Sequence, residues 1–214
     1  RAPRELDDDM RRKIALFTNV PFEAVISAYD VESTIYEIPL IFSRQGLDVI
    51  ALERLSLEYQ ECELGGWEHV VEVFRQREGS VRIAVVGKYI ELNDSYKSVD
   101  EALYHGGIAN DRRVELVKVD SEMLENLETE EEVADALRGV DGILVPGGFG
   151  SRGIEGMVRA ARYARENGVP YFGICLGLQV MVIEYSRNVL GLEKANSTEF
   201  DQDGPHPVVS LLEE

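Results

Sequence analysis

The sequence YFGICLGLQVMVIEYSR, residues 171–187, joins a short apolar run to a longer stretch with helical spacing. The first part predicts a buried strand over 171–175, and the second predicts a helix over 178–187. The same alternation occurs three times upstream. There the predicted strands are 81–87, 114–120 and 142–148, and the predicted helices are 96–105, 129–137 and 155–166. Apolar strands that alternate with helices favour an α/β fold, with an open, mostly parallel sheet covered by helices on both faces.

The first 79 residues do not show this regular alternation of apolar strands and helices. Two apolar runs, 13–19 and 24–29, predict strands, and residues 31–45 predict a helix that Gly46 ends. Residues 52–79 are weakly patterned apart from a short helical piece that contains Trp67. We therefore expect a boundary between two parts of the chain near residue 79.

Composition narrows the class of protein. Hydrophobic residues make up 44% of the chain, which is enough for a packed core. The formal net charge of −18 argues against a general nucleic-acid-binding protein and favours an acidic, solvated surface. No run of 18 apolar residues predicts a membrane span. The two cysteines, Cys62 and Cys175, are far apart, so we expect no disulfide framework and a reducing, cytoplasmic compartment.

Cys175 lies between Gly173 and Gly177, where the predicted strand turns into the predicted helix. This spacing resembles the nucleophile elbow, with Cys in place of Ser. A sharp strand-to-helix turn strains the backbone at the nucleophile and leaves little room for neighbouring side chains. The helix N-terminus would favour the thiolate, and the N–H of Leu176 could stabilise an oxyanion. An inert core cysteine is the alternative, but the flanking glycines favour a nucleophile.

A glycine-rich loop, PGGFGSRG at 146–153, follows the predicted strand 142–148. Its glycines from Gly148 to Gly153 match the G-x-G-x-x-G spacing of a dinucleotide site. We discount that interpretation, because the loop follows the third strand and the next strand does not end in an acidic residue for the ribose. A loop beside Cys175 could instead offer the Gly148 N–H as a second oxyanion donor.

Several motifs together resemble the CTP synthase family. They are LVPGGFGSRGIEG (144–156), PYFGICLGLQ (170–179), ANSTEF (195–200), VGKYIELNDSYKSVDEAL (86–103), KIALFTNV (13–20) and AYDVESTIYEIPL (28–40). The resemblance covers nearly the whole chain. It implies a flavodoxin-like class I glutamine amidotransferase domain over 80–214, incomplete at its C-terminus. It also implies a linker over 53–79 and the C-terminal tail of an α/β synthetase domain over 1–52.

The resemblance implies a ligase of pyrimidine biosynthesis that makes CTP from UTP, ATP and glutamine. The synthetase domain of the family phosphorylates UTP with ATP and Mg²⁺. Ammonia then arrives from the amidotransferase domain through a channel and displaces the phosphate. GTP is the allosteric activator of the family, which assembles as cytoplasmic homotetramers. Neither a nucleic acid nor a membrane is an implied partner.

The same resemblance assigns roles to residues of the amidotransferase part. Cys175 would be the nucleophile that forms a γ-glutamyl thioester. Gly148 and Leu176 would supply the oxyanion donors. The other residues implied at the glutamine site are Gly177, Leu178, Gln179 and Glu199.

Nucleotide-binding positions follow from the resemblance alone. Lys13 matches a residue that contacts the pyrimidine nucleotide. Tyr29, Asp30 and Val31 match a segment around the ATP adenine. Phe149 would stack on the purine of GTP. No metal ligand is implied within this sequence.

Two family motifs are missing from the sequence. One is the H-P-E motif, whose His is the general base oriented by the Glu. The other is the phosphate-binding loop G-x-x-x-x-G-K-[ST]. We assign His69, His105 and His206 to structure or surface, because none matches the family's base. The chain is therefore expected to be truncated at both ends, with little sustained glutaminase activity of its own.

Two other functions stay open at this point. One is a different cysteine-dependent glutamine amidotransferase or a γ-glutamyl hydrolase, although a hydrolase would not need the nucleotide-site motifs of residues 13–40. The other is a non-catalytic binding domain.

Overall fold

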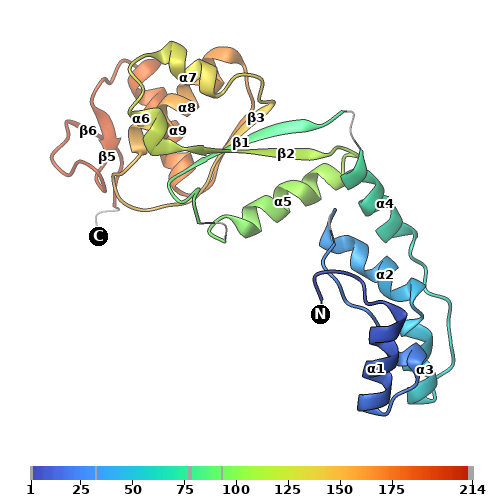
Figure 1. Ribbon diagram of the computed structural model, residues 1–214. Coiled ribbons are helices and arrows are strands. Elements are labelled where there is room, and N and C mark those ends of the chain that lie inside the picture. Colours follow the sequence, from blue (N-terminus) through green and yellow to red (C-terminus); the bar gives the residue numbers. More distant parts are fainter. Residues whose placement is uncertain (1, 32, 77–78, 93, 212–214) are drawn as a thin grey trace. The chain divides into compact units, whose positions relative to one another are not determined.

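The computed structural model describes residues 2–31, 33–76, 79–92 and 94–211 of the 214-residue chain. The chain forms two compact units, Arg1–Glu78 and Gly79–Glu214 (Figure 1). The first is built from helices and turns, and the second contains a parallel sheet.

The described part of the first unit contains helices where the sequence predicts strands. Its helices are α1 (Asp8–Thr18), α2 (Ile38–Arg44), α3 (Leu47–Leu55) and α4 (Gly65–Arg75), with 3-10 turns η1 (Phe22–Ala24) and η2 (Ile35–Glu37). The strand predicted over 13–19 is wrong, because these residues lie in or just after α1. Asp7 caps this helix by accepting from the Met10 N–H, and Asn19 ends it in the left-handed conformation.

The strand predicted over 24–29 is also wrong. A side chain takes the place of the expected strand partner: the Gln45 amide accepts from the Ser27 N–H at 2.7 Å and donates to the Ser27 carbonyl at 3.0 Å. The extended pairing here is limited, within the described residues, to an isolated bridge between Ala2 and Tyr29. Buried backbone groups need partners, and one glutamine side chain supplies them without a sheet.

The helix predicted over 31–45 is shorter than expected. It starts as η2, capped by Thr34, and continues as α2. Gly46 follows it at φ 73° and directly precedes α3, which the sequence pattern does not predict. Helix α4 packs on η2, where the rings of Tyr36 and Trp67 stack at 6.1 Å. Residues 65–75 therefore pack within the first unit.

The second unit contains a four-stranded parallel sheet in the order β2-β1-β3-β4. Its strands are β1 (Val81–Gly87), β2 (Val114–Asp120), β3 (Gly142–Val145) and β4 (Tyr171–Gly173). This is the order of flavodoxin-like doubly wound folds, in which ligands bind beyond the carboxyl ends of the strands near the point where the strand order reverses. Here that point lies between β1 and β3.

Helices cover both faces of this sheet (Figure 1). Alternate residues of β1 divide between two clusters, since Ala84 and Val86 join a large core and Val85 joins a smaller one. Helices α8 (Ile154–Asn167) and α9 (Leu176–Asn188) build the large core, and α5 (Lys97–Ile108) covers the other face. The α/β class with helices on both faces is confirmed.

Short elements complete the unit. Helices α6 (Ser121–Glu125) and α7 (Glu130–Ala136) connect β2 to β3. Strands β5 (Ala195–Ser197) and β6 (His206–Val209) form a separate parallel pair, which the sequence pattern does not predict. Strand β5 lies within the ANSTEF segment, and Glu199 follows the strand by two residues.

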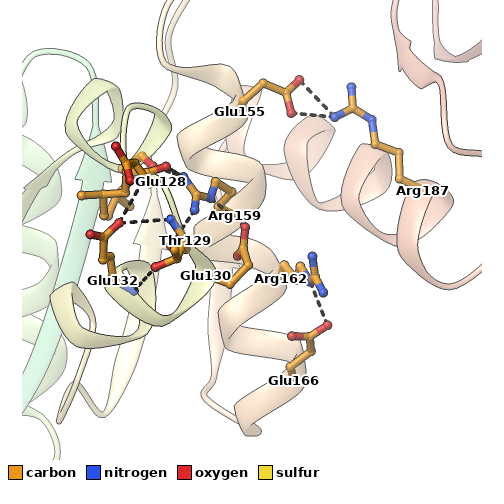
Figure 2. A network of polar contacts seen from close by, with 11 residues as sticks. Glu128, Thr129, Glu130, Glu132, Glu155, Arg159, Arg162, Glu166 and Arg187 are labelled. Atoms are coloured by element: carbon orange, nitrogen blue, oxygen red, sulfur yellow. Dashed lines mark hydrogen bonds and ion pairs between the residues drawn. The ribbon is translucent and has the colours of Figure 1, made fainter.

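Arg159 of α8 holds the connection between α6 and α7 (Figure 2). Its guanidinium donates to the carbonyls of Leu124, Leu127 and Thr129 at 2.7–2.8 Å and to Glu130 at 2.9 Å. The Leu124 carbonyl lies in the last turn of α6, and the Leu127 and Thr129 carbonyls lie in the irregular connection to α7. One arginine therefore satisfies groups that a helix or sheet would otherwise pair.

We expect Arg159→Leu to lower the free energy of unfolding by about 2–3 kcal/mol, because several charge-assisted hydrogen bonds are lost and their carbonyl partners are left without this donor. Arg162→Leu on the same helix is the matched control, since within the described residues Arg162 pairs with the exposed Glu166 alone. Its effect should stay within about 0.5 kcal/mol. Urea denaturation followed by circular dichroism measures both, and equal losses would contradict the assigned role of Arg159.

Candidate active site

Cys175 occupies a strained backbone position between β4 and α9. Its φ of 53° and ψ of −104° lie in a region that residues other than glycine rarely adopt. The residue is exposed, and it is the N-cap of α9. A nucleophile elbow has this arrangement, in which the turn presents the side chain beyond the end of the sheet.

Close packing explains the two glycines around Cys175. A Cβ built on Gly173 would lie 2.3 Å from the carbonyl carbon of Gly177. One built on Gly177 would lie 2.1 Å from the carbonyl oxygen of Val145. Real Cβ atoms do not approach main-chain atoms this closely, so the turn tolerates only glycine at both positions.

The glycine-rich loop lies directly beside this turn. A Cβ built on Gly147 would contact the Cβ of Cys175 at 3.7 Å, and one on Gly148 would lie 3.2 Å from Leu176. The Ile174 N–H donates to the Val145 carbonyl at 2.9 Å, which ties the two strand ends together. The thiol and the loop are therefore neighbours at one edge of the sheet.

Two backbone donors are available at this edge. The Leu176 N–H belongs to the first turn of α9, where N–H groups have no partner within the helix. The Gly148 N–H lies in the loop after β3. Neither donates a hydrogen bond to another described residue. Such donors can bind an anion or a developing oxyanion.

The loop is held by a carboxylate and an ammonium group. Glu199 Oε1 accepts from the Gly150 N–H at 2.9 Å. Lys88 Nζ donates to the Phe149 carbonyl at 3.1 Å and also to the Gly150 carbonyl. Burial lowers the pKa of Lys88, while the Glu199 carboxylate opposes that shift. Sequence reasoning missed Lys88, although its place directly after β1, at the reversal of strand order, was a usable signal.

The other residues predicted at the glutamine site differ in exposure. Gln179 carries a buried Oε1 that has no hydrogen-bond partner among the described residues. A carboxamide oxygen in this position can accept a hydrogen bond from a bound ligand. Leu178 is half exposed, and Phe149 is 80% exposed. Gly177 is buried, and its carbonyl accepts from the Tyr171 hydroxyl at 2.9 Å, so this carbonyl is already engaged.

An open pocket of about 430 Å³ lies beyond the ends of β1 and β2. Its lining residues are Lys88, Tyr89, Ile90, Glu91, Leu92, Asp120, Glu122 and Arg152. Arg152 pairs with Glu122 at 2.6 Å. The pocket therefore has mixed charge.

Three of the four nucleotide-binding residues predicted in the first unit line one pocket, and the fourth does not. Tyr29, Asp30 and Val31 line a mostly apolar pocket of about 330 Å³. Its other lining residues are Ala28, Ile35, Ile38, Ile41 and Phe42. Lys13 is exposed on α1 and does not line this pocket.

None of the three histidines hydrogen-bonds to Cys175 in the described part of the chain. His69 lies on α4, His105 on α5 and His206 on β6, and all three are exposed. Over the same residues, no group of three or more His, Cys, Asp or Glu side chains could hold a metal ion. No described helix is both long and apolar enough to cross a membrane.

Comparison with known proteins identifies two family models along the chain. The model "Glutamine amidotransferase class-I" matches residues 91–210, which is more than half of the chain. The model "CTP synthase N-terminus" matches residues 1–57. The first match contains both the glycine-rich loop and Cys175.

Relatives that align with nearly the whole chain are named CTP synthase. CTP synthase of Aquifex aeolicus is 54% identical over all 214 residues, and the aligned part is 39% of that protein. CTP synthase of Syntrophus aciditrophicus is 54% identical over 98% of this chain and 38% of its own length. The chain thus spans well under half the length of the curated relatives that it matches.

A solved structure also matches a large part of this chain. The Trypanosoma brucei CTPS glutaminase domain with bound acivicin has a TM-score of 0.59 and 49% sequence identity, covering 63% of this chain and 51% of that chain. At this identity the likeness extends to the sequence as well as the fold. The chain therefore belongs to the class I glutamine amidotransferase family, and within that family it is similar over its whole length to CTP synthases.

Proposed function

We propose that this chain is part of a CTP synthase, which makes CTP from UTP with ATP and with ammonia released from glutamine at Cys175. The observation that carries the proposal is the exposed, strained Cys175 beside a glycine-rich loop with an available N–H. The relatives named CTP synthase support the choice of product. The chain spans 39% of the first of them, so the activity belongs to a longer protein.

The chemistry at Cys175 follows from its surroundings. The sulfur attacks the γ-carboxamide carbon of glutamine, and the carbonyl oxygen gains negative charge. The N–H groups of Gly148 and Leu176 receive that charge. The tetrahedral intermediate then expels ammonia and leaves a thioester, which water hydrolyses to glutamate and free thiol. Proton transfers in these steps need a base, which we assign to the H-P-E histidine that this sequence lacks.

Glu199 and Gln179 have the chemistry to hold the amino-acid end of glutamine. Glu199 uses Oε1 for the Gly150 N–H, which leaves Oε2 to accept from the α-ammonium of the substrate. The buried Oε1 of Gln179, which has no partner among the described residues, is a second acceptor close to the nucleophile in sequence. Exposed Leu178 would contact the aliphatic part of the substrate.

The remaining assignments concern nucleotides. The pocket at Tyr29, Asp30 and Val31 has an apolar lining that suits the face of the ATP adenine. Lys13 would contact the pyrimidine of UTP or CTP when the rest of the synthetase domain is present. Phe149 is exposed enough to stack on the purine of GTP. We assign Mg²⁺ to the ATP phosphates in the synthetase domain, and we expect a homotetramer in the cytoplasm.

Substitution of Cys175 separates this function from its alternatives. In the full-length protein, Cys175→Ala should lower glutamine-dependent CTP formation by more than about 10³-fold, because the nucleophile is lost. CTP formation from added ammonium chloride should stay within about twofold of wild type, since ammonia bypasses the thiol. Cys62→Ala is the matched control, because Cys62 is also exposed. A glutamine-like diazoketone should label wild type and the control but not Cys175→Ala, as mass spectrometry measures.

Several outcomes would contradict the proposal. Glutamine hydrolysis by Cys175→Ala at the wild-type rate would exclude the thioester. Glutamine hydrolysis without CTP formation from ammonia, UTP and ATP would favour a γ-glutamyl hydrolase. Absence of labelling in the wild-type protein would favour a non-catalytic binding domain.

Glu199→Gln tests the role of the carboxylate. The new side chain at position 199 keeps an oxygen that can accept from the Gly150 N–H, but it lacks the negative charge that would face the α-ammonium of the substrate. We therefore expect the KM for the substrate glutamine to rise about 10–100-fold. CTP formation from ammonia should not change. Glu193→Gln, an exposed acid of the same segment, is the matched control. Steady-state kinetics with varied glutamine measures both, and an unchanged KM in Glu199→Gln would remove Glu199 from the binding site.

A further inference from the structure

Lys88 is a buried lysine that the proposed chemistry does not use. It follows β1 directly and is 5% exposed. A buried ammonium is costly, and a hydrophobic residue of similar volume would fill the space at lower cost. Its positive charge therefore calls for an explanation in terms of what it contacts.

The side chain of Lys88 contacts three consecutive residues of the glycine-rich loop. Its Nζ donates to the carbonyls of Phe149 and Gly150. Its aliphatic stem lies against Gly148, where a built Cβ would be 3.8 Å from Cδ and 3.9 Å from Cε. The residue that offers the Gly148 N–H is thus packed on the same lysine that binds the next two carbonyls.

Lys88 and Glu199 hold opposite ends of one peptide group. The group between Phe149 and Gly150 has its carbonyl oxygen on Lys88 Nζ and its N–H on Glu199 Oε1. Gly150 has a φ of 74°, where backbone rotation is unrestrained by a side chain. A cation on the oxygen and an anion on the N–H fix the orientation of this peptide group, which glycine alone would leave free to rotate.

Lys88 is itself fixed before it reaches the loop. Its N–H donates to the Tyr96 hydroxyl at 3.1 Å, and its carbonyl accepts from Arg152 at 3.4 Å. Tyr96 is 6% exposed and lies so close to Gly87 that a Cβ there would be 2.5 Å from its hydroxyl oxygen. The backbone from which the lysine extends therefore has little freedom to move, and the ammonium reaches the loop from a rigid base.

We propose that Lys88 is a positioning residue for glutamine hydrolysis: its ammonium holds the glycine-rich loop so that the Gly148 N–H faces the carbonyl attacked by Cys175. This inference rests on the proposed function, because it assigns a purpose to the loop in that reaction. Lys88 acts through the loop and does not contact the reacting atoms.

The test compares Lys88→Met with wild type in the full-length protein. Methionine keeps a similar stem and removes the ammonium. We expect kcat for glutamine hydrolysis to fall about 10²-fold, the lower end of the loss seen when one oxyanion donor is removed. The KM for glutamine should stay within about threefold, because Glu199 and Gln179 remain. Lys194→Met, the same change at an exposed lysine, is the matched control and should keep wild-type kinetics.

Two further measurements separate positioning from general damage to the fold. CTP formation from added ammonium chloride should be unchanged in Lys88→Met. Iodoacetamide should alkylate Cys175 within about twofold of the wild-type rate, since displacement of iodide develops no oxyanion, whereas inactivation by the glutamine-like diazoketone should slow at least tenfold.

Each other outcome overturns the proposal. Glutamine hydrolysis by Lys88→Met within threefold of wild type, with Cys175→Ala inactive, would show that the loop needs no ammonium and would leave the proposed function standing. A parallel fall in hydrolysis, ammonia-dependent synthesis and iodoacetamide alkylation would make Lys88 a purely structural residue. Full activity of Cys175→Ala would instead reject the proposed function, and with it the role of Lys88.

Discussion

The second unit depends on a close approach between the end of β3 and the turn after β4. Gly177 passes so near the Val145 carbonyl that no side chain fits between them, and Gly173 is packed as tightly against Gly177. Within this tight turn the backbone of Cys175 has a φ of 53°, and its side chain is exposed. The same contact brings the loop after β3 beside the sulfur. Strain at one residue and the absence of two side chains therefore create the site together.

Two residues of opposite charge, Lys88 and Glu199, then restrict the conformation of the glycine-rich loop. A loop with glycines at four of its eight positions has many accessible conformations, and only one orientation of its N–H groups serves an oxyanion. Lys88 from the end of β1 and Glu199 from the segment after β5 bind the loop from two separate elements. The chain is strongly acidic overall, yet a buried cation lies where the loop needs one. Net charge describes the surface of this protein and says little about its site.

Sequence patterns predicted the elements whose signals are local. The residues of β1 and β2 were predicted to the last position, and Cys175 with its glycines was recognisable because the elbow occupies five consecutive residues. One failure involves a local cap, and the others involve partners that are distant in sequence. Residues 13–19 look like a strand unless the Asp7 cap is weighed, and residues 24–29 lack a sheet because Gln45 bonds to Ser27. Lys88 was missed because the carbonyls that it binds lie 61 and 62 residues later in the chain.

The site also separates two demands of thiol catalysis. Stabilising the charge on the attacked carbonyl requires rigid donors, and the loop, the elbow and α9 supply these within one unit. Moving protons requires a base that contacts the sulfur, and among the described residues no histidine does so. An exposed thiol at a strained turn leaves room for such a group to approach from another segment. The N–H donors must be fixed at the edge of the sheet before the reaction, because donors that reorganise during the reaction stabilise the transition state less. A base needs only to reach hydrogen-bonding distance, so it is the part of this site that a separate segment can provide.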